Sequence, residues 1–335
     1  MSRTAMPPFL RLAAVSLGVI LLLLAPQGWT QKSGFKGPPT GSAKLLFSSG
    51  FEDSTALSGP SDCYGTGCWQ NIAGMDRSTG FSWPPNVWGG GRTRFQLLAD
   101  ARVDAGTIGN YMVNQIQTVT GHDGKPTRAL YSEIKRSGCC GTGSQGSRPT
   151  QNPLMLQPVG ETSDLYIRYR LKYQPDLAKI LVPPNWRVVF EFKTAGDYRV
   201  IASVVTWGIG APLSWHIIGD NEANGGLKYQ KFWEAYNTNN PIPIGQWFKF
   251  EVFWHRSSGS DGRVWMAVND RMIVDRYGPN KAIPDPKGIT AFPDSPRPID
   301  RIMVSQLYSE SAYPIYQWVD DLQIWDGFPP DAAPH

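Results

Sequence analysis

From residue 45 onward, hydrophobic and polar residues alternate over many short stretches. A period of two is the pattern of a strand with one buried face. Clusters of Gly, Asp and Ser, such as residues 256–263, separate these stretches and are typical of hairpin turns. The pattern predicts an all-β protein, a β-jelly-roll sandwich of two antiparallel sheets, with long loops over 56–125. The predicted strands are 45–53, 129–136, 165–173, 186–194, 198–207, 213–220, 247–255, 263–278, 301–309 and 316–327.

The same alternation assigns side chains to the two faces of each strand. In several stretches one face is apolar, whereas the other carries Arg, Lys, His, Asn or Trp. Such a sheet is typical of a concave polysaccharide groove, because aromatic rings stack on sugar rings and cations meet carboxylates. The alternative is an ordinary solvated face. The polar faces hold Arg187, Glu191, Lys193, His216, Arg263, Trp265 and Asn269, and the apolar face of 186–194 holds Trp186, Val188, Phe190 and Phe192.

Composition agrees with a folded β protein. Of the 335 residues, 41% are apolar and 18% are charged, which excludes a disordered chain. The 35 Gly, 28 Pro and 12% aromatic residues argue against a helical bundle, because Gly and Pro interrupt helices and aromatic rings pack well on pleated sheets.

The N-terminal residues have the pattern of a secretory signal peptide. Arg3 and Arg11 precede an uncharged apolar run of 14 residues, Leu12 to Ala25, shorter than the roughly 20 that span a bilayer. A retained membrane anchor is the alternative, because no small-x-small cleavage site follows. We expect a secreted protein, extracellular or periplasmic, with no stable membrane span after cleavage. The expected segments are a signal peptide at 1–30, a linker at 31–44, one domain at 45–329 and a tail at 330–335.

Charge is spread unevenly along the chain. The formal net charge is +4, and the segment from Lys125 to Arg199 contains twelve Lys or Arg against six Asp or Glu. A local excess of one sign steers an anionic polymer into a cleft. Because the chain has an export signal and no nucleic-acid-binding motif, we expect an acidic polysaccharide as partner and no nucleic acid.

The four cysteines form two local pairs, Cys63 with Cys68 and Cys139 with Cys140. In an exported protein an even number of cysteines predicts disulfides. The sequence leaves the pairing open. Zinc is disfavoured, because no second Cys-x-x-Cys or nearby His pair would complete a tetrahedral site.

Acidic residues gather in the first and last predicted strands. Glu52 and Asp53 lie in the first, and Asp320 and Asp321 lie in the last. Terminal strands of a sandwich often neighbour each other, and hard oxygen ligands suit Ca²⁺. One expectation is a structural calcium ion at Glu52, Asp53 and Asp321, remote from the groove. The other is that these are exposed acidic turn residues without a metal.

Residues 245–280 (GQWFKFEVFWHRSSGSDGRVWMAVNDRMIVDRYGPN) resemble a hairpin of the heparin-lyase-I-like jelly-roll polysaccharide lyases. This group includes alginate and glucuronan lyases and belongs to the concanavalin A-like lectin and glucanase superfamily. Residues 190–194 (FEFKT) resemble a strand that carries catalytic or substrate-contacting side chains there, and 50–54 with 316–327 resemble the first and last strands. The resemblance covers most of 45–328. It implies an enzyme that cleaves a uronic-acid polysaccharide by β-elimination without a catalytic cofactor, and we expect a monomer.

By position, the resemblance assigns catalysis to Lys193, His216 and Tyr229. β-Elimination needs a group that neutralises the uronate carboxylate, a base for the C5 proton and an acid for the leaving oxygen. Lys193 would neutralise the carboxylate, or act as base if burial lowers its pKa. His216 would be the base near neutral pH and Tyr229 the acid. Each also has a structural interpretation, as a solvated lysine, a hydrogen-bonded histidine and a packed tyrosine.

One motif departs from the alginate lyases of this architecture. They often carry Arg-Ser-Glu-Leu-Arg on a groove strand, whereas this chain has YSEIK at 131–135, which lacks the first Arg and replaces the second by Lys. Arg128 or Arg136 could reach the same groove. The expected substrate-binding residues are Arg187, Glu133, Glu191, Trp265, Asn269 and Arg263.

Two other functions compete with a lyase. A non-catalytic, lectin-like carbohydrate-binding sandwich needs aromatic rings and cations but no close Lys/His/Tyr cluster. A glycoside hydrolase on this fold needs two carboxylates flanking the scissile bond, commonly as Glu-x-Asp-x-x-Glu on one strand. That motif does not occur in the sequence.

Overall fold

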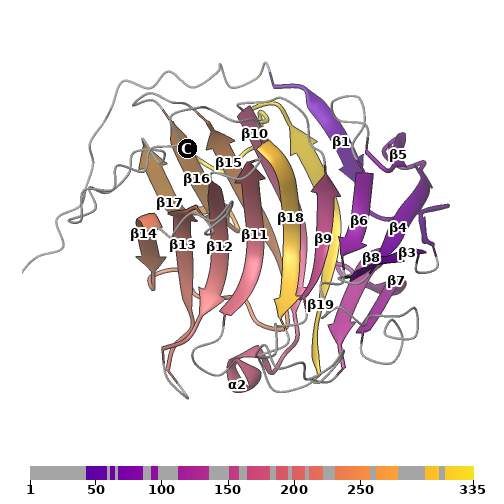
Figure 1. Ribbon diagram of the computed structural model, residues 1–335, viewed down its shortest axis with the longest axis horizontal. Helices are drawn as coiled ribbons and strands as arrows, with labels where there is room; N and C mark the ends of the chain where they lie inside the picture. Colours follow the sequence, from indigo (N-terminus) through magenta and orange to yellow (C-terminus); the bar gives the residue numbers. More distant parts are fainter. Residues whose placement is uncertain are drawn as a thin grey trace, which may run out of the picture. The chain divides into compact units, whose positions relative to one another are not determined.

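The computed structural model describes most of the chain from residue 43 to the C-terminus, and the structural statements below concern the described residues. Apart from the short helix α2 (Leu177–Ile180), their regular elements are strands (Figure 1). The strands pair into two antiparallel sheets, which confirms the predicted all-β sandwich. The described ranges are 43–58, 61–64, 67–85, 92–96, 112–135, 151–157, 164–181, 186–194, 198–207, 211–221, 231–256, 262–277, 299–308 and 314–335.

The first sheet has eight strands. Their order is β17, β16, β15, β10, β19, β8 and β7, and β1 also pairs with β19. The bounds are β1 (Leu45–Ser49), β7 (Met112–Thr120), β8 (Pro126–Ile134), β10 (Asp164–Tyr173), β15 (Trp247–His255), β16 (Arg263–Val268), β17 (Arg271–Tyr277) and β19 (Ile315–Trp325).

The second sheet has eleven strands, six of which run side by side across Figure 1 from β14 to β9. The order is β14, β13, β12, β11, β18, β9, β6, β4 and β2, and β3 and β5 pair with β4. The bounds are β2 (Ala56–Leu57), β3 (Ser61–Tyr64), β4 (Gly67–Asp76), β5 (Phe81–Trp83), β6 (Arg92–Gln96), β9 (Gln151–Gln157), β11 (Trp186–Thr194), β12 (Arg199–Val205), β13 (Ser214–Asp220), β14 (Lys231–Asn237) and β18 (Ile299–Tyr308).

The prediction of long loops over 56–125 is wrong, because β2 to β7 lie in that region. These strands are short or carry polar residues on both faces, so their period-two pattern is weak, although Ile72 and Trp83 lie in the core. Their backbone groups still pair, β6 with β9 and β7 with β8, and this pairing satisfies N–H and C=O groups that would otherwise be left at the edges of the sheets.

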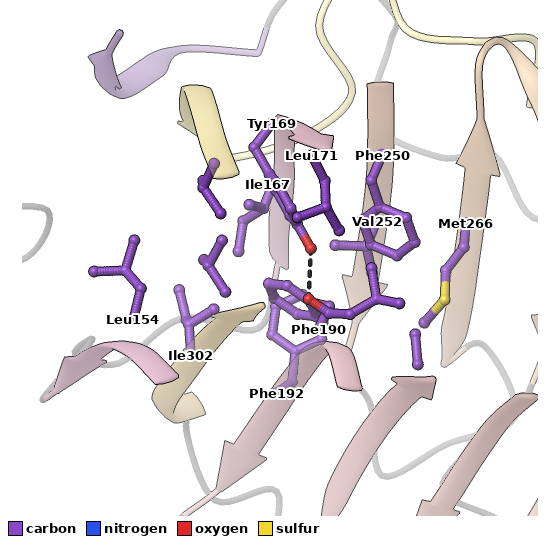
Figure 2. Close-up of a cluster of buried hydrophobic side chains, with 14 of the residues drawn as sticks. Leu154, Ile167, Tyr169, Leu171, Phe190, Phe192, Phe250, Val252, Met266 and Ile302 are labelled. Carbon is purple, nitrogen blue, oxygen red and sulfur yellow. Dashed lines mark hydrogen bonds between the residues drawn. The ribbon is translucent and has the colours of Figure 1, made fainter. Parts of the chain in front are cut away.

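Large apolar side chains fill the space between the sheets. Figure 2 shows Phe190 and Phe192 of the 11-stranded sheet facing Phe250 and Tyr169 of the 8-stranded sheet. The ring centroids of Phe190 and Phe250 are 6.5 Å apart. The hydroxyl of Tyr169 donates a 2.6 Å hydrogen bond to the carbonyl oxygen of Val189. Because both sheets bury one face here, each has an opposite face, which we call its outer face.

A β-bulge in β11 changes which of its residues face outward. Val188 pairs with Ser203 and Phe190 with Ala202, so Val189 is an extra residue. Val189, Phe190 and Phe192 all lie in the core between the sheets, whereas Val188 packs with residues of β12 and β13 outside it. Beyond the bulge, the outer face carries Glu191 and Lys193. Strict alternation cannot detect this shift in phase.

Arg187 lies on the opposite side of β11 from the one predicted. It is buried between the sheets, 6.0 Å from the ring of Tyr173, and its Nη1 lies 3.5 Å from Oε1 of Gln317. The bulge is the physical reason, because it puts Arg187 and Lys193 on different faces. Arg187 therefore cannot contact a ligand on the outer face.

The C-terminal residues pack on the 8-stranded sheet, although the sequence predicts a separate tail. The ring of Phe328 lies 5.2 Å from that of Trp265, and the ring of His335 stacks on Phe328 at 3.9 Å. The N–H of Ala333 donates a 3.1 Å hydrogen bond to Oε1 of Glu251. This segment covers one end of the outer face of the 8-stranded sheet.

At the other end of the chain, the predicted signal peptide at 1–30 and residues 31–42 of the predicted linker lie outside the described residues. Within the described part of the chain, no helix has the length and apolar character needed to cross a bilayer.

The core packing predicts a large effect of Phe190→Ala. Removing a fully buried phenyl ring should lower the free energy of unfolding by about 3–5 kcal/mol, through lost burial and a cavity. Met272 on β17 is 50% exposed, so Met272→Ala should change that free energy by less than about 1 kcal/mol. Urea unfolding followed by tryptophan fluorescence measures both. Equal effects of the two substitutions would contradict the assigned core.

Candidate functional site

Charged side chains cluster on the outer face of the 11-stranded sheet, where β18, β11, β12 and β13 lie side by side. Lys193 on β11 pairs across the sheet with Arg301 on one side and Arg199 on the other. Arg199 in turn pairs with Asp220 of β13. Glu191 is two residues from Lys193 on the same face. Three cations and two carboxylates thus share one patch, which we call the lysine cluster.

Lys193 is the most perturbed cation of the lysine cluster. Its residue is only 8% exposed. Burial lowers the pKa of its amine to about 8, and repulsion from Arg301 and Arg199 acts in the same direction. At pH 7 about a tenth of such an amine is neutral, far more than for a solvated lysine. A neutral lysine held among arginines can accept a proton from a bound substrate.

The carboxylates of the lysine cluster have different roles. Asp220 is fully buried and holds Arg199 through two hydrogen bonds, 2.5 Å from Nε and 3.1 Å from Nη2. Burial raises the pKa of Glu191, and one of its oxygens, Oε1, accepts no hydrogen bond from the described residues. The Nε of Arg301 is also buried without an acceptor among them. The lysine cluster therefore has donor capacity left for an anionic ligand.

A second group of polar side chains, the histidine cluster, lies farther along β13 and β14. His216 Nε2 is 2.8 Å from Oε1 of Glu234, and its ring stacks on Tyr236 at 4.6 Å. Tyr236 and Lys231 also donate hydrogen bonds to Glu234. Burial alone would raise the pKa of Glu234, but these hydrogen bonds outweigh it and lower the value to about 2. Glu234 is therefore ionised.

Burial lowers the pKa of His216, and its hydrogen bond to Glu234 only partly opposes this effect. His216 is therefore mainly neutral at pH 7. A neutral imidazole facing an ionised carboxylate donates from the nitrogen that faces it, so we assign the proton to Nε2 and the lone pair to Nδ1.

A pocket of about 370 Å³ connects the two clusters along β12 and β13. Arg199 and Asp220 line it toward the lysine cluster, and His216, Lys231 and Glu234 toward the histidine cluster. Large rings are exposed around it. Trp186, which also lines it, is 42% exposed, and Trp207 and Tyr236 are 66% and 45% exposed with centroids 5.4 Å apart. Exposed rings beside a polar pocket can stack on sugar rings.

The structure does not bring Lys193 and His216 together. Lys193 is two strands from Asp220, and His216 lies four residues from Asp220 along β13. With about 4.8 Å between strands and about 3.3 Å per residue, their Cα atoms are about 16 Å apart. One sugar carbon cannot contact both side chains, so the predicted single catalytic cluster is wrong for this pair. Tyr229 lies outside the described residues.

Four other predicted substrate-binding residues lie on the 8-stranded sheet. Glu133 is on β8, Arg263 and Trp265 are on β16, and Asn269 is in the turn after β16. Trp265 is fully buried under the C-terminal residues, and Arg263 forms an ion pair with Asp275 at 2.8 Å. Alternation gives the face of a strand but not the sheet to which it belongs, so these four residues cannot join Lys193 and Glu191 in one groove.

Several residues of the site escaped the sequence interpretation. Alternation in 301–309 puts Arg301 on the strand face opposite to the buried Ile302, so the sequence could have identified this arginine as an outer-face residue. The sequence contains no comparable indication for Arg199 and Glu234, because they belong to the site through their contacts with residues of other strands. Trp186 was predicted in the core, and the β11 bulge moves it to the outer face.

Of the predicted calcium ligands, Glu52 and Asp321 lie near each other beside Gly50, but all three are engaged with other groups of the protein. Oδ2 of Asp53 accepts a 2.9 Å hydrogen bond from the N–H of Arg77, and Oδ2 of Asp321 is 3.7 Å from Nδ1 of His122. Glu52 instead faces Thr127, whose hydroxyl oxygen is 3.0 Å from Oε1. Among the residues described, no three His, Cys, Asp or Glu side chains are arranged to hold a metal ion. The residues present thus do not fit the predicted calcium ion.

The predicted disulfides are only partly within reach of the description. Cys63 and Cys68 lie on β3 and β4, which pair with each other. Cys139 and Cys140 lie outside the described residues. Disulfide formation stays a prediction.

Comparison with known proteins finds no matching family model and no matching curated protein. Solved structures of similar fold include alginate lyase Aly36B, at 15% identity and a TM-score of 0.41, over 66% of this chain and 85% of that one. An endo-β-1,4-glucuronan lyase from the fungus Trichoderma reesei has 11% identity and a TM-score of 0.44, over 67% and 94%. The carbohydrate recognition domain of Emp47p has 10% identity and a TM-score of 0.34, over 65% and 89%. Similarities of this size assign no activity to this chain.

The electrostatics of the lysine cluster predict a specific titration. Lys193 should titrate near pH 8, and Arg301→Met should raise its pKa because a repulsive charge is removed. NMR of protein labelled with ¹³C at the lysine side chains measures the value. Arg77→Met, which removes an exposed arginine from another part of the fold, is the control and should leave the pKa unchanged. A normal lysine pKa for Lys193 in the wild-type protein would contradict the described burial.

Proposed function

We propose that the protein binds an acidic, uronic-acid-containing polysaccharide on the outer face of the 11-stranded sheet and cleaves it by β-elimination. The observation that carries this proposal is the buried, 8% exposed Lys193 between Arg301 and Arg199, with a pKa lowered to about 8. A solvated structural lysine would have neither the burial nor the flanking arginines. The resemblance of 190–194 to a catalytic strand of jelly-roll polysaccharide lyases agrees with this role.

In the proposed step, the neutral amine of Lys193 takes the proton from C5 of a uronate. The C5–H electrons form the C4=C5 double bond, the C4–O bond breaks, and the leaving oxygen takes a proton from an acid. Arg301, whose Nε has no acceptor among the described residues, would hold the uronate carboxylate and stabilise the charge that builds up as C5 loses its proton. Arg199 would assist, and Asp220 fixes its orientation.

Tyr229 remains the proposed acid on the basis of the resemblance alone. His216 takes a different role from the one expected, because about 16 Å separates it from Lys193. With Trp186, Trp207 and Tyr236 nearby, the histidine cluster is suited to hold sugar units away from the cleaved bond. The pocket between the clusters would then bind consecutive units of one chain.

A lectin-like protein without activity is the second candidate. The observation that favours it is the separation of Lys193 from His216, since binding needs rings and cations but no close catalytic cluster. The two candidates differ in whether a product with a C4=C5 double bond appears.

Incubation with alginate, glucuronan, heparin, hyaluronan and pectate tests the proposal. At least one polymer should give an unsaturated product, followed by its ultraviolet absorbance. Lys193→Met should lower kcat by about 10²- to 10⁴-fold, the usual contribution of a general base. Lys179→Met, an exposed lysine on α2, is the matched control and should retain full activity. Binding without product from any polymer would support the lectin-like candidate, and full activity of Lys193→Met would exclude Lys193 as the base.

The pH profile identifies the base independently. Lys193 acts only as the free amine, so kcat/KM should rise about tenfold per pH unit below about 8 and level off above it. Arg301→Met should move the rising part of the pH profile to higher pH, because it raises the pKa of Lys193. A rise in activity that levels off below the ordinary histidine pKa and is insensitive to Arg301→Met would instead assign the base to His216, whose pKa is lowered by burial.

A further inference from the structure

A row of aromatic side chains crosses the outer face of the 8-stranded sheet, on the opposite side of the sandwich from the lysine cluster. Tyr131 of β8 pairs with Trp318 of β19, Trp318 with Lys172 of β10, and Lys172 with Trp247 of β15. These four residues, which we call the aromatic row, stand side by side on four adjacent strands. At about 4.8 Å per strand the row is about 14 Å long.

Ring contacts, cation–π contacts and hydrogen bonds hold the side chains of the aromatic row in place. Tyr131 and Trp318 have centroids 5.3 Å apart, and Nζ of Lys172 lies 5.5 Å from the ring of Trp318 and 5.9 Å from that of Trp247. Trp247 donates from Nε1 to the carbonyl oxygen of Thr120 at 2.8 Å. Trp318 donates to Oε1 of Gln117 at 3.1 Å. All four residues of the row are partly exposed.

A polar pocket adjoins the aromatic row. It has a volume of about 340 Å³, and Arg168, Arg170 and Lys249 line it. Arg168 and Arg170 precede Lys172 on the same strand and face, so cations continue from the row into the pocket. All three cations are paired with carboxylates, Arg168 with Asp331 at 2.9 Å, Arg170 with Asp321 at 3.9 Å, and Lys249 with Asp270 at 2.6 Å and Glu251 at 3.2 Å. Lys172 has no carboxylate partner within the described part of the chain.

We propose that the aromatic row and the adjoining pocket form a second carbohydrate-binding surface, which takes an acidic polysaccharide on the outer face of the 8-stranded sheet. The row is linear, its indole N–H groups are already bonded, and what it offers a ligand is ring faces and the ammonium of Lys172. Sugar rings stack on such faces, and a uronate carboxylate complements the ammonium. The charge of Lys172, which has no carboxylate partner among the described residues, is what favours an anionic sugar chain over an uncharged ligand.

This surface contains some of the cations of the basic segment between Lys125 and Arg199. The sequence predicts that the cations between Lys125 and Arg199 gather around one groove. Instead Lys193 and Arg199 face outward on the 11-stranded sheet, whereas Arg168, Arg170 and Lys172 face outward on the 8-stranded sheet. The proposal rests on the proposed function only for the choice of an acidic polysaccharide as ligand.

Retardation in native gels that contain alginate or polyglucuronate measures binding without any need for turnover. Trp318→Ala should weaken retardation about two- to tenfold, the range expected for one lost ring contact. The double variant Trp247→Ala/Trp318→Ala should weaken it further. Lys172→Met keeps most of the aliphatic stem and removes the charge, so it should weaken binding mainly at low salt. Lys179→Met is the matched control for charge and should behave as wild type.

The outcomes separate this proposal from the lyase proposal. Trp318→Ala should leave the cleavage of a short oligosaccharide unchanged, because the aromatic row and the lysine cluster lie on different sheets. Lys193→Met should remain retarded by the polymer. If no polymer is cleaved, retardation in the gels still measures binding to the aromatic row, because it does not depend on turnover. Unchanged retardation of folded Trp318→Ala and Lys172→Met overturns the proposal, as does complete loss of retardation in Lys193→Met. Self-association of the wild type that Trp318→Ala abolishes in sedimentation would make the row a protein contact and also overturn it.

Discussion

The packing of β11 against the 8-stranded sheet is the constraint on which the candidate site depends. Phe190 and Phe192 must face Phe250 and its neighbours to close the core, and the extra residue at Val189 lets them do so. Glu191 and Lys193 are thereby directed to the outer face, between strands that desolvate them. The same bulge sends Arg187 into the core and Trp186 to the surface. One inserted residue thus decides which charges a ligand can contact.

Desolvation on a sheet face explains why the lysine cluster differs from an ordinary charged surface. A solvated strand lysine keeps its charge, because water stabilises the ammonium form. Lys193 loses most of that water and is placed beside two arginines, and both effects favour the neutral amine. Glu191 responds in the opposite direction for the same reason, since burial favours its neutral acid. Shifted pKa values of this kind are found at functional sites and in structural ion-pair networks alike, so the activity and pH measurements on Lys193 are what distinguish the two.

The two outer faces divide the polar chemistry of the protein. The 11-stranded sheet carries the lysine and histidine clusters with a pocket between them, whereas the 8-stranded sheet carries the aromatic row and a second pocket. Antiparallel neighbours far apart in the sequence build both faces, as the pairing of Lys193 with Arg301 illustrates. Under the two proposals together, one long polymer would contact both faces of a molecule and would be cleaved only on the 11-stranded sheet.

Sequence alone determined the fold class, most strand positions outside 56–125, and the polar face on which Lys193 lies, because hydrophobic alternation reflects the burial of one strand face. It could not determine the bulge, because an extra residue leaves composition unchanged and only shifts phase. Nor could it assign strands to sheets, so Trp265, Arg263 and Lys193 were expected in one groove although they lie on different sheets. The tertiary structure decided the partners of Lys193 and its separation of about 16 Å from His216, because both depend on cross-strand pairing between distant segments.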